Sequence, residues 1–158
     1  KYLFYFIIFL IIFLLDRVSK IYIINIASNN GFVDIYINNF LNIILVWNSG
    51  IAFGLLSSEN NNFYHIITLI IILINIFIIY MTFTSDKIRS FFLVVILGGS
   101  LGNLFDRIYY SAVPDFIDLN YNGFHWFIFN FADVFITLGI ICLILIEFLE
   151  YKKVKNEK

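Results

Sequence analysis

Residues 63–83 form an apolar run of 21 residues that carries no formal charge, and this run most constrains how the chain can fold. An α-helix needs about 20 apolar residues to cross the ~30 Å hydrocarbon core of a bilayer. Three further apolar runs occupy residues 2–24, 88–108 and 127–149. Because backbone groups inside lipid must be hydrogen-bonded within their own segment, each run is predicted to be a helix. The predicted fold class is a membrane all-α protein with four transmembrane helices.

Composition supports lipid as the surrounding solvent. Of the 158 residues, 61% are hydrophobic and only 13% are charged. Soluble domains have about 45–50% apolar and about 25% charged residues, so this excess cannot be hidden in one small core surrounded by water. Residues 1–158 are therefore predicted to form a single membrane-embedded domain.

The segment 25–60, between the first two runs, has a different pattern. Residues 32–37 alternate between apolar and polar side chains, and residues 42–47 are rich in β-branched and aromatic types. This pattern predicts a small extracytoplasmic antiparallel β-sheet between the first and second helices. The segment 109–126 holds the only proline, Pro114, and is predicted to be a loop or a short extra element.

The distribution of basic residues predicts the orientation in the membrane. With four spans, both termini and the turn near residues 86–90 lie on one side. That side would hold seven of the ten basic residues, namely Lys1, Lys87, Arg89, Lys152, Lys153, Lys155 and Lys158. By the positive-inside rule, the N- and C-termini are predicted to be cytoplasmic.

Several function classes are disfavoured by the rarer residues. A net charge of −1 gives no basic field that would hold nucleic acid. The single cysteine, Cys142, excludes an internal disulfide, and two histidines are too few for a His-rich metal site. We therefore expect neither a metal nor a cofactor.

The acidic residues gather toward the opposite, outer side of the predicted topology. Seven of the eleven lie there, namely Asp16, Asp34, Glu59, Asp106, Asp115, Asp118 and Asp133. Three of these, Asp16, Asp106 and Asp133, come from different predicted helices at a similar depth. A charged residue at the centre of a span costs at least ~2.5 kcal/mol, so acids within spans are candidates for function.

Each of these three acids also has a purely structural explanation. Asp16 could end the first helix in a pair with Arg17 or Lys20. Asp106 could form an ion pair with the neighbouring Arg107, the interpretation we favour for it. A carboxylate such as Asp133 in the first turn of a helix offsets the exposed N–H groups there.

Aspartates that meet at a water–lipid boundary can support hydrolysis. Two carboxylates held close together share one proton, so that one activates water while the other polarises a carbonyl group. Spacing alone does not decide whether Asp115 or Asp118 would belong to such a pair of carboxylates. A proton-relay transporter subunit and a non-catalytic assembly subunit are the rival functions, although a transporter would spread its acids through the membrane depth.

Five segments, in order, resemble the motifs of one family, the lipoprotein signal peptidase (signal peptidase II) of bacteria. They are residues 16–20 (Asp-Arg-Val-Ser-Lys), 48–53 (Asn-Ser-Gly-Ile-Ala-Phe), 98–107 (Gly-Gly-Ser-Leu-Gly-Asn-Leu-Phe-Asp-Arg), 113–116 (Val-Pro-Asp-Phe) and 129–133 (Phe-Asn-Phe-Ala-Asp). The resemblance covers essentially the whole chain.

This resemblance implies an aspartyl endopeptidase of the bacterial inner membrane, with Asp115 and Asp133 as its catalytic residues. It would remove the signal peptide of a prolipoprotein just before a cysteine that carries diacylglycerol, near the periplasmic face. Membrane lipid and globomycin-type inhibitors would be further partners, and we expect a monomer. The outer sheet would be the family's β-cradle, and the loop after Asp106 a mobile cover. Supporting positions around the substrate and the two aspartates would be Asp16, Asn48, Gly50, Phe53, Asn103, Asp106, Arg107 and Asn130.

Overall fold

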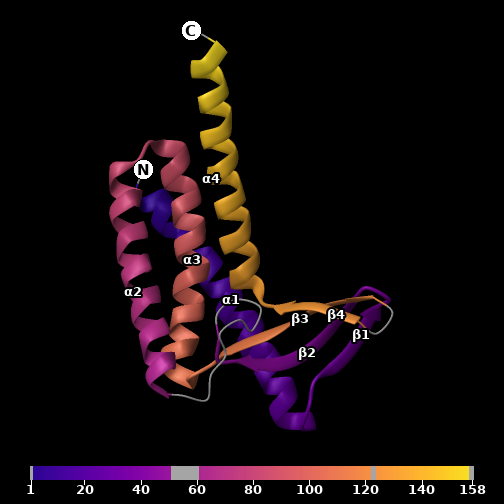
Figure 1. Ribbon diagram of the computed structural model, residues 1–158. Helices are drawn as coiled ribbons and strands as arrows, with labels where there is room; N and C mark the ends of the chain where they lie inside the picture. Colours follow the sequence, from indigo (N-terminus) through magenta and orange to yellow (C-terminus); the bar gives the residue numbers. More distant parts are fainter. Residues whose placement is uncertain (1, 51–60, 122–123, 157–158) are drawn as a thin grey trace.

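The computed structural model describes residues 2–50, 61–121 and 124–156. In chain order its elements are α1 (Tyr2–Asn30), β1 (Asp34–Asn38), β2 (Leu41–Asn48), α2 (Asn61–Thr84), α3 (Lys87–Tyr110), β3 (Val113–Tyr121), β4 (Phe124–Phe129) and α4 (Phe131–Asn156). The helices form a bundle, and the strands form one sheet that projects from one end of it (Figure 1). The start of α1 and the end of α4 lie toward the opposite end of the bundle (Figure 1).

Among the described residues, three helices are long and apolar enough to cross a membrane: Tyr64–Thr84 within α2, then α3 and α4. Large apolar side chains point outward from them, as at Leu73 (57% exposed) and Leu145 (52% exposed). Lipid is the natural solvent for such surfaces. The first apolar run also forms a helix, α1, in which Asp16, Arg17 and Lys20 are buried.

Three predicted helix boundaries are wrong. The first helix does not stop near residue 24 but continues to Asn30 through polar residues, and the last does not stop near residue 149 but continues to Asn156 through charged residues. An apolar run marks the part of a helix that could lie in lipid, and the helix itself extends beyond it. The last helix also begins at Phe131 rather than at residue 127, because residues 124–129 belong to β4. Aromatic residues run from this strand into the helix, so the change of element leaves no change in hydropathy.

The sheet is larger than the sequence predicted. Its strand order is β1-β2-β3-β4, and every neighbouring pair is antiparallel. The prediction of a sheet confined to residues 25–60 was therefore wrong. β3 and the start of β4 come from the segment 109–126, predicted to be a loop or a short extra element, and the rest of β4 comes from the predicted fourth helix. Pro114, which suggested the loop, lies at the second position of β3 opposite Trp47, near the strand end where proline is tolerated.

The chain after Asp106 also differs from the mobile cover that the resemblance implied. It continues as helix to Tyr110, turns at Ser111, whose φ of 58° is left-handed, and enters β3 at Val113. A left-handed residue after the last helical turn is a common way to end a helix. The turn brings β3 alongside β2 in the sheet.

The sheet packs over the last turns of α1. Ile23 of α1, Val33 and Phe116 of β3 form a buried apolar cluster, and partly buried apolar residues of α1, β2 and β3 pack against it. This contact fixes the sheet at the end of the bundle where α3 ends and α4 begins.

Glycines let the helices approach closely around α3. A Cβ added at Gly98 would lie 2.9 Å from Ile12 of α1, and one added at Gly102 would lie 2.5 Å from Oδ2 of Asp16. One added at Gly99 would lie 2.5 Å from the backbone oxygen of Ala132 in α4. The close packing predicted from the small residues at 98 and 102 is confirmed.

We expect Gly99→Ala to destabilise the α3–α4 contact. The opposing atom is backbone and cannot rotate away, and such overpacking costs about 1–3 kcal/mol. Gly139→Ala should also destabilise this interface, because its added Cβ would lie 2.5 Å from Cγ1 of Ile96, which branches next to the backbone, and 3.1 Å from the backbone oxygen of Phe92. Thermal unfolding in detergent should give a lower midpoint for each variant than for the wild-type protein. A wild-type midpoint for Gly99→Ala would contradict this account of the interface.

Candidate active site

Asn130 connects two aspartates from different elements, Asp115 of β3 and Asp133 of α4. Its side-chain Nδ2 donates to Oδ1 of Asp115 at 2.6 Å. Its backbone N–H donates to Oδ2 of Asp133 at 3.2 Å, and the N–H of Asp133 donates back to Oδ1 of Asn130 at 3.2 Å. This reciprocal pair caps the start of α4, so the residues that begin the helix also bring the two carboxylates together.

Each aspartate has a further amide partner. Oδ2 of Asp115 accepts a hydrogen bond from Nδ2 of Asn48, at the end of β2, at 2.9 Å. The Oδ1 of Asn48 in turn accepts from the N–H of Gly50 at 2.8 Å. Oδ1 of Asp133 accepts from Nδ2 of Asn103 in α3 at 2.8 Å. Amide donors therefore fix the orientation of both carboxyl groups.

Burial sets the protonation behaviour of Asp115, which is 3% exposed. Burial, followed by repulsion from the negative charge of Asp133, raises the pKa of Asp115 to about 6, against the opposing effect of the Asn48 and Asn130 donors. A carboxyl group with such a pKa can hold or release a proton near neutral pH, which general acid–base catalysis requires.

The raised pKa predicts a pH-dependent stability. Because the folded pKa of about 6 lies above the ordinary 3.8, the stabilising proton is bound in full below pH ~4. The contribution of this proton to the free energy of unfolding is lost as pH rises through 6, and it amounts to ~3 kcal/mol in total. Relative to Asp115→Asn, the wild-type protein should therefore become less stable between pH 4 and pH 7. Unfolding midpoints of the two proteins that run parallel across this range would contradict the expectation.

A buried ion cluster lies beside the aspartates, between α1 and α3. Nη2 of Arg17 is 2.8 Å from Oδ2 of Asp16 and 2.6 Å from Oδ2 of Asp106. Nζ of Lys20 lies 2.9 Å from the carboxylate of Asp16 and 2.7 Å from that of Asp106. Lys20 and both aspartates are fully buried. The cluster is neutral overall, as a buried group of charges should be.

The cluster is connected to the aspartate pair at two points. Nζ of Lys20 donates to Oδ1 of Asn103 at 2.7 Å, which leaves the Asn103 amide nitrogen directed at Asp133. Oδ1 of Asp16 accepts from the N–H of Ala132 at 3.1 Å, in the first turn of α4. The cluster therefore supports the helix start that carries Asp133.

Two structural expectations from the sequence require correction. Asp106 does not pair with Arg107 but with Arg17 and Lys20 of α1, because Asp106 lies on the face of α3 that meets α1, whereas the Arg107 guanidinium donates to the backbone oxygen of Gly50. Asp16 pairs with both cations of α1, as considered, yet it does not end the helix.

Arg107 instead faces the end of β2 and the start of α2. Its Nη2 donates to the backbone oxygen of Gly50, and its guanidinium lies 5.8 Å from the ring centroid of Tyr64. The hydroxyl of Tyr64 donates to the backbone oxygen of Arg107 at 2.7 Å. Nη1 of Arg107 is buried and has no hydrogen-bond partner within the described chain. Phe53, another expected site residue, lies outside the described residues.

Asp118, the alternative to Asp115, is engaged elsewhere. It is fully buried, and its two oxygens lie 2.9 and 2.8 Å from Nδ1 of His125 on β4. Asn120 donates to it as well, at 3.2 Å. Asp118 therefore stabilises the β3–β4 hairpin, whereas Asp115 accepts a hydrogen bond from Asn130, the residue that bridges Asp115 and Asp133.

Comparison with known proteins identifies the family. A sequence profile described as signal peptidase (SPase) II matches residues 8–149. The chain belongs to the signal peptidase II family. The lipoprotein signal peptidase of Pelagibacter ubique (strain HTCC1062) is 52% identical over 152 residues, covering 96% of this chain and 92% of the relative. That of Anaplasma marginale (strain Florida) is 37% identical over 144 residues, covering 90% and 83%.

Solved structures agree with this assignment to signal peptidase II. One bacterial membrane enzyme, determined in meso at 2.3 Å resolution, superposes with a TM-score of 0.74 and 31% identity over 98% of this chain and 91% of that one. A second, at 1.9 Å resolution, gives a TM-score of 0.68 and 32% identity over 89% and 90%. The likeness extends over helices and sheet together.

In this signal peptidase II chain, the fold brings together most residues that the sequence singled out. Asn48, Asn103 and Asn130 contact the two aspartates directly, whereas Asp16 and Asp106 belong to the adjoining ion cluster. Lys20 was not predicted as a site residue. Its spacing of four from Asp16 on a helix was the available signal, since such residues share a face. No group of three or more His, Cys, Asp or Glu side chains in the described parts is placed to hold a metal ion.

Proposed function

We propose that the chain is a membrane aspartyl endopeptidase that removes signal peptides from diacylglyceryl-modified prolipoproteins, with Asp115 and Asp133 as its catalytic pair. The observation that supports this most strongly is the Asn130 bridge, which holds two carboxyl groups with one amide side chain and one backbone N–H. The name of the relatives, lipoprotein signal peptidase, suggests the substrate class.

The proposed reaction is the addition of one water molecule across a peptide bond. One aspartate, protonated, donates a hydrogen bond to the scissile carbonyl, while the other, ionised, removes a proton from water. The resulting hydroxide attacks the carbonyl carbon and forms a tetrahedral intermediate. The proton taken from water then passes to the amide nitrogen, and the C–N bond breaks. This frees the α-amino group of the modified cysteine and leaves a new carboxyl group at the end of the signal peptide.

The substrate is proposed to approach along lipid-facing surfaces next to Asp133. An apolar cavity of about 290 Å³ lies there, lined by Asp133 together with Phe127, Phe129, Val134, Thr137 and Leu138. Apolar walls with one polar group are typical of ligand sites. On the other side, Nη1 of Arg107, which has no hydrogen-bond partner among the described residues, would hold the substrate backbone, and Asn48 would orient the Asp115 carboxyl group beside it. Gly50, whose backbone oxygen accepts from Arg107, would complete that side.

We further propose that α1 is a fourth transmembrane helix, in a bacterial inner membrane. Its outward side chains include Leu3 (72% exposed) and Val18 (65% exposed), a surface suited to lipid. Basic residues at the start of α3 and the end of α4 favour a cytoplasmic location for that end of the bundle. The sheet and the aspartates would then lie near the periplasmic face, where the diacylglyceryl anchor would hold the substrate cysteine within their reach.

A cleavage assay with purified protein tests the proposal. A peptide that carries a signal sequence and a diacylglyceryl cysteine should be cut before that cysteine, whereas the same peptide without the lipid should not. EDTA should leave the rate unchanged, and globomycin should block it. Absence of cleavage by folded protein, or its loss with EDTA, would contradict the proposal and favour a transport or assembly role.

A further inference from the structure

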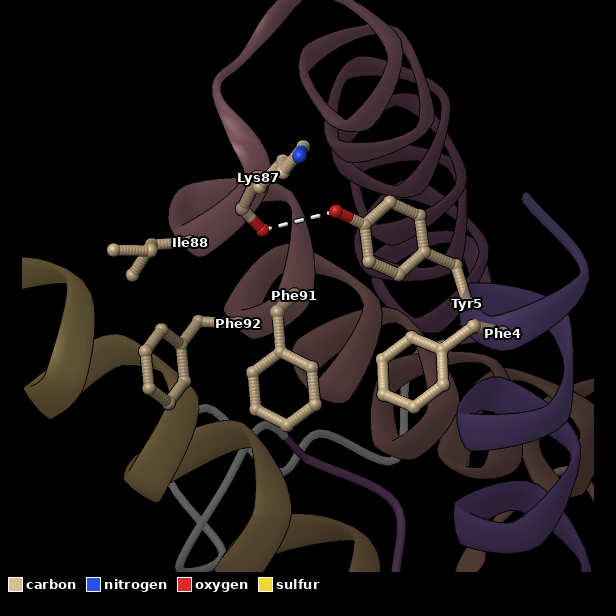
Figure 2. A pocket seen from close by; sticks show the side chains of 6 residues that line it. All are labelled: Phe4, Tyr5, Lys87, Ile88, Phe91 and Phe92. Atoms are coloured by element: carbon tan, nitrogen blue, oxygen red, sulfur yellow. Dashed lines mark hydrogen bonds between the residues drawn. The ribbon is translucent and has the colours of Figure 1, made fainter. Parts of the chain in front are cut away.

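A second cavity lies between the first turns of α1 and α3 (Figure 2). These turns lie at the end of the bundle opposite to the sheet (Figure 1). The volume of the cavity is about 640 Å³, within the range of small-molecule sites. Its lining is aromatic and aliphatic apart from one charged residue, and comprises Phe4, Tyr5, Lys87, Ile88, Phe91 and Phe92. We call it the α1–α3 groove.

The walls of the α1–α3 groove are fixed by contacts between the two helices. The hydroxyl of Tyr5 donates to the backbone oxygen of Lys87 at 2.9 Å, as drawn in Figure 2. The rings of Phe4 and Phe91 stack with centroids 6.3 Å apart, and those of Phe91 and Phe92 meet edge to face at 5.1 Å. The groove is therefore a formed apolar surface.

The one charged lining residue has no carboxylate partner in the described part of the chain. Lys87 is exposed at the start of α3, and no ion pair joins it to a described acid. Its neighbour Arg89 differs, because it binds Asp86 and, on the α4 side, Glu147 and Glu150. Arg89 thus engages Asp86, Glu147 and Glu150, whereas Lys87 lies at the edge of the groove on the side of Tyr5 (Figure 2).

We propose that the α1–α3 groove binds a phospholipid with a net negative headgroup. One acyl chain would lie against Phe4, Phe91 and Phe92, and the headgroup phosphate would pair with the ammonium of Lys87. An apolar groove that ends at an unpaired cation matches an anionic amphiphile, and basic pockets between transmembrane helices bind such headgroups. The site is separate from the aspartate pair, so the proposal does not depend on the peptidase mechanism.

Native mass spectrometry of the delipidated full chain in detergent tests the site. The probes are phosphatidylglycerol and phosphatidylcholine with identical acyl chains, which differ in net charge. The wild-type protein should retain phosphatidylglycerol more strongly. Lys87→Gln should weaken phosphatidylglycerol binding about fivefold, the effect of one lysine near an anionic headgroup, and should change phosphatidylcholine binding little.

Two further variants make the result decisive. Lys152→Gln removes a lysine of α4 that lies near the Phe148 ring and does not line the groove, so it should bind lipid like the wild-type protein. Ile88→Trp, at an exposed position, should fill the groove and weaken both lipids while the unfolding midpoint stays unchanged. Equal losses for Lys87→Gln and Lys152→Gln would overturn the proposal, as would a dimer that Ile88→Trp abolishes, since a second copy would then occupy the groove.

Discussion

Asp115→Asn and Asp133→Asn should each lower kcat for signal-peptide cleavage by roughly 10²–10⁴-fold, the usual contribution of a general acid or base. Asparagine matches aspartate in shape but neither removes a proton from water nor donates one to a leaving amine. The Asn130 bridge would still find an oxygen acceptor at each position, so the start of α4 should remain folded. Turnover at saturating substrate, with circular dichroism as the folding check, measures the effect.

Asp118→Asn is the matched control for that experiment. Asp118 lies on the same strand and is as buried as Asp115, yet it contacts His125 rather than the Asn130 bridge. We expect it to weaken the β3–β4 hairpin and to leave kcat within a few-fold of wild type. If Asp118→Asn lost as much activity as Asp115→Asn, the assignment of the catalytic pair to Asp115 and Asp133 would fail.

Lys20→Met should destabilise the folded protein by about 3–5 kcal/mol, the cost of leaving a buried charge without its partner. Lys20 is fully buried and donates to Asp16, Asp106 and Asn103. Its removal would leave two carboxylates with Arg17 alone. The double variant Lys20→Met/Asp16→Asn restores a neutral cluster and should recover part of the stability.

Arg89→Met provides the comparison for the buried cluster. Arg89 also binds three carboxylates, but their side chains are 47–64% exposed. Exposed ion pairs contribute about 0–1 kcal/mol each, so this variant should lose far less stability than Lys20→Met. Unfolding midpoints in one detergent compare the two variants directly. Similar losses of stability in the two variants would mean that burial does not make the ion pairs of Lys20 more important for stability than the exposed ion pairs of Arg89.

Hydropathy made the long helices predictable, because a charge-free run such as residues 63–83 has few alternatives to a membrane helix. The sheet was only half predictable. In residues 124–129, an aromatic strand runs almost directly into an apolar helix, and composition does not separate the two. Only pairing with β3 makes this segment a strand, and such pairing is a long-range contact that a local pattern does not contain.

The site shows the same division between local and long-range information. The capping relation of Asn130 to Asp133 is local and follows from their spacing. The pairing of Asp106 with Lys20 is not local, since it depends on which face of α3 meets α1. The neighbouring Arg107 was the nearer partner in sequence but points elsewhere. Motif order identified the residues, whereas helix packing determined their partners.

The most direct test of the catalytic pair is whether the two carboxyl groups influence each other's protonation. Carbon-13 NMR of labelled aspartate side chains can follow Asp115 through a pH titration in the wild-type protein and in Asp133→Asn. We expect a pKa of about 6 in the wild type. In the variant it should fall, because the nearby negative charge is gone, and should stay above 3.8 because burial remains. An unchanged pKa for Asp115 in Asp133→Asn would show that the two groups do not act as a pair.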